Sequence, residues 1–290
     1  MTLDQLRIFV GVAEREHMTR AAEALHVTQS AASAAISALE TQHGVKLFHR
    51  VGRRIELTDA GRVFLEEARA VLGRAASAEL ALAEFAGLQR GTLHLVASQT
   101  IVNYWLPRYL SAFRARYPLV AIDLAIANTE QAIQRVTAGT AELGFVEGAI
   151  DDCAISHWAV AHDRLVLVGA VPVAQIDDAW LRNARWIVRE SGSGTRSTFE
   201  DALHIRGLDP EKLDIALTLP SNESVRTAVE AGAGVAVLSA LVVARALSTG
   251  VLHSLPFELP ERPFFALCHK ERYRSKAANA LLDLIEESMP

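Results

Sequence analysis

Apolar and polar positions follow a helical period through the first ninety residues of the chain. The first apolar set lies at i, i+3, i+4 and i+7 and predicts one buried helical face, made by Leu6, Phe9, Val10 and Ala13. Thr19 is a suitable N-cap for a short second helix over residues 20–25. Residues 26–28 then form a tight turn, and a third helix is predicted over residues 29–43.

The third helix has two different faces. Its apolar residues Ala32, Ile36 and Leu39 can pack against the first two helices. The opposite face carries alanines and short uncharged polar side chains: Gln29, Ser30, Ala31, Ser33, Ala34, Ser37 and Thr41. Such a face lets a helix approach the floor of a DNA major groove, where Ser and Gln reach base edges and Ala meets a thymine methyl. A tightly packed structural helix explains this stretch equally well when it is considered alone.

The next stretch predicts a basic hairpin, or wing, with strands at 45–50 and 53–57 around a Val51-Gly52 turn. Residues 41–55 contain no Asp or Glu, and their cations are Lys46, Arg50, Arg53 and Arg54. Cations beside a groove bind phosphates, which gives salt-dependent affinity rather than choice of sequence. A basic hairpin next to a groove-compatible helix favours DNA binding over an ordinary solvated surface.

After Thr58, a predicted N-cap, a helical pattern without proline continues to about residue 85 and would be roughly 40 Å long. An apolar stripe follows it, made of Phe64, Val71, Ala75, Ala78, Leu82 and Phe85. A helix of this length has no domain of its own to cover the stripe, so we expect it to pair with a second copy of the chain. Two recognition helices would then meet adjacent major-groove faces, which predicts a roughly palindromic target.

Residues 86–91 form a predicted hinge, and beyond it short apolar strands alternate with helices. Strands are expected at 93–97, 121–125, 143–146, 165–169, 186–189, 216–219 and 235–238, with helices ending near 117, spanning 129–137, and starting near 195 and 223. Short apolar runs between helices indicate parallel βαβ units.

Composition and charge narrow the class of protein. The 290 residues carry a net charge of −5, but residues 1–90 hold 11 Lys/Arg against 11 Asp/Glu and residues 91–290 hold 18 against 23. The acidic excess therefore lies outside the basic hairpin, and a local patch is what DNA senses across a screening length of about 8 Å. Cys153 and Cys268 are far apart in the sequence, without a metal-ligand spacing, and indicate two free thiols in a cytoplasmic protein. Charges near the N-terminus argue against a signal peptide, and the lack of a long apolar run argues against a membrane span.

The N-terminal segment resembles the DNA-binding domain of the LysR-type transcriptional regulators. The matching features are in register over some sixty residues: Phe9, the helix from Thr19 to Leu25, Thr28-Gln29-Ser30, Ile36 with Leu39-Glu40, Leu47-Phe48-x-Arg50, and Leu57-Thr58-x-Ala60-Gly61. The resemblance implies that Gln29, Ser30 and Ser33 face bases and that the wing arginines face the DNA backbone. It also implies a C-terminal effector domain like the periplasmic substrate-binding proteins, with two lobes, two crossovers and a cleft.

Four segments at predicted strand ends or helix starts fit an effector cleft. They supply Ser98, Gln99 and Thr100; Asn128 and Thr129; Ser193, Thr195 and Arg196; and Ser221 and Asn222. Hydroxyl, amide and free backbone N–H groups at helix starts favour an anion, although any one of these residues alone is an ordinary helix cap. The resemblance favours a sulfur oxyanion, a sugar phosphate or a small carboxylate. Glu147 opposes an anion unless it is protonated, paired with an arginine, or matched by a ligand cation.

The sequence therefore predicts an α/β protein with a winged helix-turn-helix at 1–58, a linker helix and hinge at 59–91, and a two-lobed effector domain at 92–290. Lobe I is expected at 92–161 and 266–290, and lobe II at 162–265. The predicted function is sequence-specific, effector-controlled regulation of transcription by a homodimer or homotetramer, with RNA polymerase as a further partner of an activator. Cofactors and metals are not expected, and the chain lacks a phosphate loop, a dinucleotide fingerprint and a nucleophile elbow. An enzyme or a solute-binding protein using the same cleft is the alternative.

Overall fold

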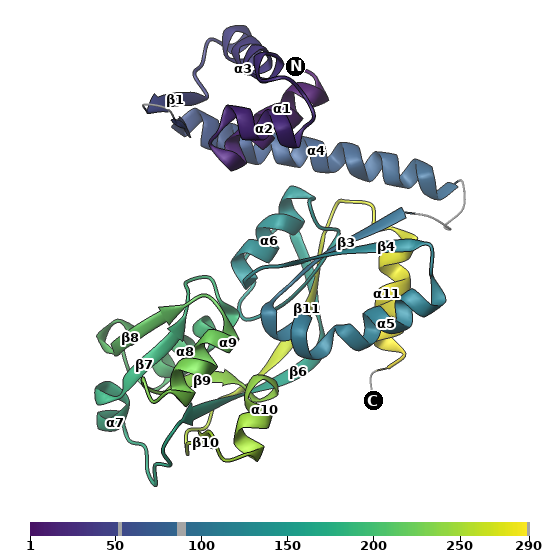
Figure 1. The fold of residues 1–290 in the computed structure, drawn as a ribbon. Coiled ribbons are helices and arrows are strands. Elements are labelled where there is room, and N and C mark those ends of the chain that lie inside the picture. The colour runs from purple at the N-terminus through teal and green to yellow at the C-terminus, as the bar shows by residue number, and fades with distance from the viewer. Residues whose placement is uncertain (52–53, 86–90, 289–290) are drawn as a thin grey trace. The chain divides into compact units, whose positions relative to one another are not determined.

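The computed structural model describes residues 1–51, 54–85 and 91–288 (Figure 1). The chain divides into two compact units, one built mainly on Met1–Ala86 and the other on Gly87–Val136 and Ala141–Pro290. We call them unit 1 and unit 2. The hinge predicted over 86–91 lies, except for its last residue, outside the described residues.

Unit 1 contains helices and a two-stranded hairpin in the predicted order: α1 (Leu3–Arg15), α2 (Met18–Ala24), α3 (Gln29–His43), β1 (Phe48–Val51), β2 (Arg54–Leu57) and α4 (Asp59–Phe85). Thr28 caps α3 by accepting a hydrogen bond from the Ala31 N–H, and Gly44 ends the helix with a φ of 66°. A left-handed residue after the last turn is a common helix end, and glycine adopts it without strain.

Two local predictions in unit 1 need correction. The second helix begins at Met18, and its N-cap is His17 rather than Thr19, because the His17 ring accepts the Arg20 N–H. The first wing strand also begins later than predicted, at Phe48 rather than at Val45. The Val45 N–H closes the end of α3 on the Glu40 carbonyl, and the Leu47 N–H bonds the Glu40 carboxylate, so neither is available for a strand ladder.

One apolar cluster holds unit 1 together. Phe9 is fully buried, and its ring centroid lies 5.5 Å from that of Phe48 in the wing and 4.8 Å from that of Phe64 in α4. The helix spacing placed Leu6, Phe9 and Ala13 correctly in this core, while Val10 is half-buried. Further along α4, Leu82 of the predicted stripe is 74% exposed.

Unit 2 is built on a seven-stranded sheet within the described residues, in the order β10-β6-β11-β5-β3-β4, with β9 pairing β6. Its strands are β3 (Gly91–Ala97), β4 (Val120–Ile126), β5 (Leu143–Glu147), β6 (Ile155–Gly169), β9 (Ala236–Ser239), β10 (His253–Ser254) and β11 (Glu261–His269). The parallel pairing expected from the sequence is present between β3 and both β4 and β5. Strands β6 and β11 instead run antiparallel over a long register, and the lobe boundaries proposed at 161/162 and 265/266 fall inside them.

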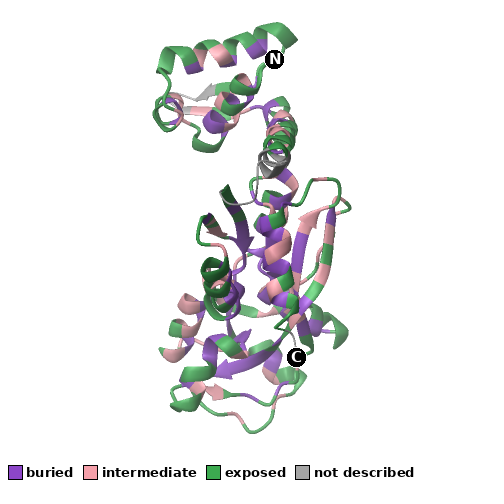
Figure 2. Cartoon of the chain, turned by 90° about the vertical axis from the view of Figure 1, so that its right-hand side faces the viewer, coloured by how far each residue is buried: buried purple, intermediate pink, exposed green. Residues whose placement is uncertain are grey.

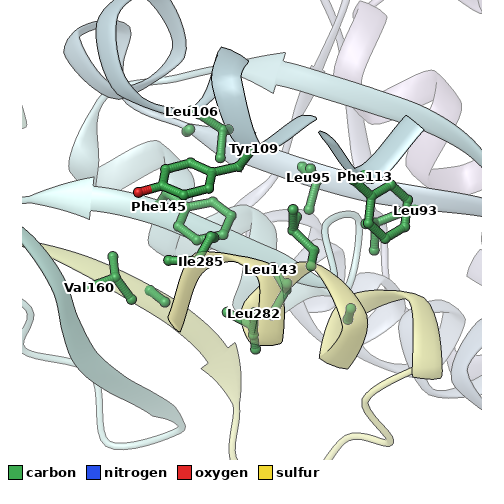
Figure 3. Close-up of a cluster of buried hydrophobic side chains, with 14 of the residues drawn as sticks. Leu93, Leu95, Leu106, Tyr109, Phe113, Leu143, Phe145, Val160, Leu282 and Ile285 are labelled. Atoms are coloured by element: carbon green, nitrogen blue, oxygen red, sulfur yellow. The ribbon is translucent and has the colours of Figure 1, made fainter. Parts of the chain in front are cut away.

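Helices pack on this sheet to form the first lobe. They are a π-helical turn at Ile101–Trp105, α5 (Pro107–Arg116), α6 (Thr129–Ala138) and α11 (Lys276–Glu286). The expected helix ending near Tyr117 is thus two segments, and α11 was not predicted. Figure 3 shows the side chains of β3, β5, α5 and α11 pointing toward one another, among them Leu93, Phe145, Phe113 and Ile285.

The second lobe has its own core around Trp186, which is fully buried. Strands β7 (Arg185–Arg189) and β8 (Asp214–Leu219) pair in parallel, as expected. The accompanying helices are α7 (Asp178–Asn183), α8 (Gly194–Ile205), the short 3-10 turn Pro210–Lys212, α9 (Asn222–Glu230) and α10 (Ala240–Ser248). Figure 2 shows buried residues along the strands of unit 2 and exposed residues on the outer faces of its helices. None of the helices described is long and apolar enough to cross a membrane.

Candidate functional site

Helix α3 presents the two faces that the sequence predicts. Ala32, Ile36 and Leu39 are 0%, 5% and 1% exposed and belong to the inner face. On the outer face Gln29, Ser30 and Ser37 are exposed and Ser33 is half-buried. The Ser30 hydroxyl lies 3.0 Å from the Thr28 hydroxyl, which orients it at the start of the helix. The outer face therefore consists of short side chains that leave the backbone accessible.

The wing follows α3 as an antiparallel hairpin in which Phe48 pairs with Leu57 and Val51 with Arg54. Arg53 lies outside the described residues, as do the side chains of Arg50 and Arg54. The Lys46 side chain is 78% exposed, and its Nζ lies 2.6 Å from the Glu40 carboxylate. The hairpin thus lies beside the buried Leu47 and the exposed, basic Lys46.

Glu40 joins α3 to the wing, a role that the sequence analysis did not identify. Glu40 is 9% exposed, and its carboxylate accepts hydrogen bonds from the backbone N–H of Leu47 at 2.9 Å and of Phe48 at 3.4 Å. Burial alone raises the pKa of Glu40, but the bonds from Lys46, Leu47 and Phe48 outweigh burial and hold the pKa below its usual value. The ionised Glu40 side chain therefore links α3 to the start of the first wing strand, β1.

In unit 2 the structure brings three predicted effector residues together across the lobes. The Asn222 side chain donates to the Thr100 hydroxyl at 2.9 Å, and the Asn222 N–H donates to the Gln99 side chain at 2.9 Å. Gln99 in turn donates to the Pro220 carbonyl at 3.0 Å. The start of α9 is thereby bonded to the segment that follows β3. Ser98 stays within its own lobe, where its hydroxyl accepts the Ile101 N–H at 3.4 Å.

A second set of contacts joins the end of β5 to the starts of α6 and α8. The Thr129 hydroxyl donates to the Glu147 carbonyl at 2.6 Å. Gly194, the first residue of α8, lies against the same carbonyl, because a Cβ built on it would stand 1.9 Å from the Glu147 oxygen. Asn128 donates to the Ser191 carbonyl at 3.3 Å. The predicted segments of both lobes thus meet directly here as well.

Arg262 lies between the lobes, a position that no pattern in the sequence predicted. Its guanidinium is 3% exposed and binds the Asp163 carboxylate at 2.9 and 2.7 Å. Its remaining contacts are the Thr195 hydroxyl at 3.2 Å and the Glu147 carboxylate at 3.6 Å. Glu147 is therefore paired with an arginine, one of the three conditions under which the sequence analysis allowed it near an anion. Arg262 and Asp163 are directly paired across β11 and β6. They are far apart in the sequence, so the pair could not be recognised from a local pattern.

Two other arginines are held by carboxylates. Arg196, which we expected to bind an anion, donates to Glu200 at 2.6 Å and to the Arg189 carbonyl at 3.2 Å. Arg189 is itself buried, pairs with Glu190 and donates to the Asn222 side-chain oxygen. Burial raises the pKa of Glu190, but the Arg189 bonds outweigh burial and lower it overall. The guanidinium of Arg196 is thus held by Glu200, one turn further along α8, and by the Arg189 carbonyl at the end of β7.

The start of α8 differs from those of the other interlobe helices. Ser193 is buried at its N-cap position, but its side chain makes no capping hydrogen bond within the described structure. At α9, by contrast, Ser221 caps the Ser224 N–H and Gln99 accepts the Asn222 N–H. The first N–H groups of an α-helix have no partner inside the helix and attract negative charge. Among the described interlobe helices, α8 is therefore the best suited to an anion.

One more contact crosses between the lobes. The Tyr104 hydroxyl donates to the Glu223 carboxylate at 2.7 Å. Burial and the bonded carboxylate raise the pKa of Tyr104 to about 12, so the hydroxyl remains a donor at neutral pH. Among the described residues, no group of three His, Cys, Asp or Glu side chains is placed to hold a metal ion.

Comparison with known proteins agrees with this two-unit organisation. Residues 3–62 match the family model "Bacterial regulatory helix-turn-helix protein, lysR family", and residues 86–290 match "LysR substrate binding domain". A probable RuBisCO transcriptional regulator from Nostoc is 34% identical over 96% of this chain and 86% of that protein. The uncharacterized HTH-type transcriptional regulator YeiE from Escherichia coli K12 is 34% identical over 98% of this chain and 96% of that protein. The crystal structure of full-length CbnR complexed with its target DNA shares the fold, with a TM-score of 0.67, 24% identity and full coverage of both chains.

Proposed function

The chain belongs to the LysR family of DNA-binding transcriptional regulators, and we propose that it switches transcription in response to a small anion held between the two lobes of unit 2. The observation that carries the DNA half of the proposal is the outer face of α3. Gln29, Ser30, Ser33 and Ser37 lie on one side of a helix whose other side is buried, next to a hairpin anchored by Glu40. The start of a recognition helix reads base edges in this way, while a basic wing contacts phosphates.

The chain acts on DNA as a homodimer or homotetramer in this proposal. Val71 and Leu82 lie on the apolar stripe of α4 and are 42% and 74% exposed. An exposed apolar stripe on a helix of 27 residues is a suitable surface for a second α4. Two paired copies would present two outer faces to a roughly palindromic operator.

The effector half of the proposal rests on the α8 start and its surroundings. Ser193 and Thr195 are buried there, and hydroxyl and backbone N–H groups bind oxyanions well. The ligand acts through its different affinity for two arrangements of the lobes, since equal affinity shifts no equilibrium. A sulfur oxyanion, a sugar phosphate or a small carboxylate is the proposed class.

The DNA half is tested by selecting duplexes bound by the full-length chain from a random pool, followed by salt titrations on a selected and an unrelated duplex. We expect an enriched sequence with approximate two-fold symmetry. Equal affinity for both duplexes would contradict sequence-specific binding.

The effector half is tested by thermal unfolding of the full-length chain with sulfite, sulfate, thiosulfate, phosphate, sugar phosphates and small carboxylates. A ligand at 100 times its Kd that binds only the folded chain adds about 2.7 kcal/mol of stability. The response should be weaker in Thr195→Ala than in Thr249→Ala, an exposed threonine outside the site. A chain that responds to none of these anions would contradict the proposed class.

A further inference from the structure

Glu147 has an oxygen atom that the contacts described so far do not explain. Its side chain is 4% exposed, and Oε2 accepts no hydrogen bond from any described residue. Arg262 contacts the other oxygen, Oε1, with its Nη2 at 3.6 Å, but this Nη2 is bonded at 2.7 Å to Asp163. Buried carboxylate oxygens without a donor are rare in folded proteins, because each one loses its hydration without replacement.

The Glu147 carboxylate lies at the start of α8. One guanidinium, that of Arg262, contacts both Glu147 and the Thr195 hydroxyl, and Thr195 is in the first turn of α8. The Glu147 main chain touches Gly194 at the same place. A 12-residue helix whose N-cap side chain forms no capping hydrogen bond thus begins beside a buried carboxylate, one oxygen of which accepts no hydrogen bond from the described residues.

The charges around this acceptor are not balanced. Asp163 and Glu147 each carry a negative charge, and Arg262 supplies the positive charge that contacts both. The Thr129 hydroxyl donates its hydrogen bond to the Glu147 carbonyl, and the Ser239 hydroxyl donates to the Asp163 carboxylate, so neither hydroxyl donates to Oε2. An oxyanion without a proton would therefore bring a second negative oxygen against Oε2, and like charges placed together are strongly unfavourable.

We propose that the effector is a small oxyanion that carries an O–H group, and that Glu147 selects it by accepting that proton in a hydrogen bond while the start of α8 binds the anionic oxygens. The O–H belongs either to the oxyanion itself, as in hydrogen phosphate, or to a neighbouring carbon, as in a 2-hydroxycarboxylate. This inference rests on the proposed anion site at α8. It adds a basis for selectivity: among anions of equal size and charge, the site prefers those that can donate a hydrogen bond to Glu147.

Matched anions test the rule on the wild-type, full-length chain. Calorimetric titrations at pH 7 compare phosphate with sulfate and monofluorophosphate, which lack the proton, and glycolate with acetate, which lacks the hydroxyl. A site that requires a donor rejects the analogue without one, so we expect phosphate or glycolate to bind at least about 100-fold more tightly than its partner. Whichever pair shows the preference identifies the source of the O–H group.

Glu147→Gln provides the second arm, because an amide can donate to an unprotonated oxygen. We expect this variant to lose the preference and gain affinity for sulfate, while Glu211→Gln, an exposed glutamate away from the cleft, behaves as wild type. The inference would be overturned if the wild-type chain bound sulfate as tightly as phosphate and acetate as tightly as glycolate. The proposed anion site at α8 would still hold in that case. Absence of binding by every anion would instead refute the proposed anion class itself. The wild-type comparison decides the question even where Glu147→Gln fails to fold.

Discussion

Replacing Glu40 by alanine should loosen the wing from α3. The Leu47 N–H is buried, and its bond to the Glu40 carboxylate is 2.9 Å long, whereas the Phe48 bond is longer at 3.4 Å. Hydrogen bonds to charged groups contribute about 1.5–3 kcal/mol each, so losing one good and one weak bond should cost about 2–4 kcal/mol. The exposed Lys46 pair adds little, because water screens it.

Hydrogen exchange read by mass spectrometry measures this loss where it occurs. Peptides containing Leu47 and Phe48 should exchange faster in Glu40→Ala, and affinity for all duplexes should fall because the wing no longer holds its place beside α3. Glu40→Gln keeps one acceptor oxygen and should show a smaller effect. Glu23→Ala, on the exposed side of α2, is the control. Unchanged exchange and affinity in Glu40→Ala would refute the assigned role of the carboxylate.

The same bond has a pH dependence of known sign. The pKa of Glu40 is lower in the folded chain than its ordinary value, so the folded state favours the ionised carboxylate. Its stabilisation is complete above the ordinary pKa and is lost as the pH falls through the lower, folded value. Protection of Leu47 should therefore decrease on acidification in the wild-type chain, more than it does in Glu40→Gln.

Four further changes have expected outcomes. Arg53→Ala, at a position outside the described residues, should weaken binding to every duplex and reduce the slope of log affinity against log salt by about one per lost phosphate contact; an unchanged slope contradicts this. Ser33→Ala should cost about 1–3 kcal/mol on selected sites only, and equal losses on random DNA would count against a base contact. Leu82→Glu should shift sedimentation toward smaller species, because the residue is 74% exposed on the proposed pairing stripe; an unchanged profile would exclude Leu82 from the interface. Gly194→Ala should lower the unfolding temperature, since its Cβ would lie 1.9 Å from the Glu147 carbonyl oxygen, and wild-type stability would argue against that contact.

Local patterns were enough to predict unit 1 closely. The inner face of α3, the start of α4 after Thr58 and the position of the wing all depend on residues within a few turns of one another. The errors there arise from side chains that compete for backbone groups. His17 caps the second helix two residues before the predicted Thr19, and the Glu40 carboxylate binds the Leu47 N–H that would otherwise extend β1.

The candidate effector site was predictable only in part. Helix starts marked Thr100, Thr195 and Asn222, because capping residues are visible in a sequence. Arg262 was not visible, since its partner Asp163 is 99 positions away. Arg262 lies on β11, which was not predicted, and Asp163 lies in the part of β6 that precedes the predicted strand at 165–169. Strand β11 begins with Glu-Arg-Pro, which reads as a loop, but these residues pair with β6, and Phe264–Leu267 pair with β5 as well.

The direct contacts between lobes limit how a ligand can act. Thr100, Gln99 and Tyr104 of one lobe already bond Asn222, Pro220 and Glu223 of the other in the described structure. A ligand that only added contacts to both arrangements of the lobes would bind without switching anything. To switch, it must favour one arrangement by an amount comparable to typical couplings between sites, about 1–3 kcal/mol. Such an amount corresponds to about one or two hydrogen bonds to charged groups. A single donor to Glu147 Oε2, made in one arrangement and not in the other, is of that size.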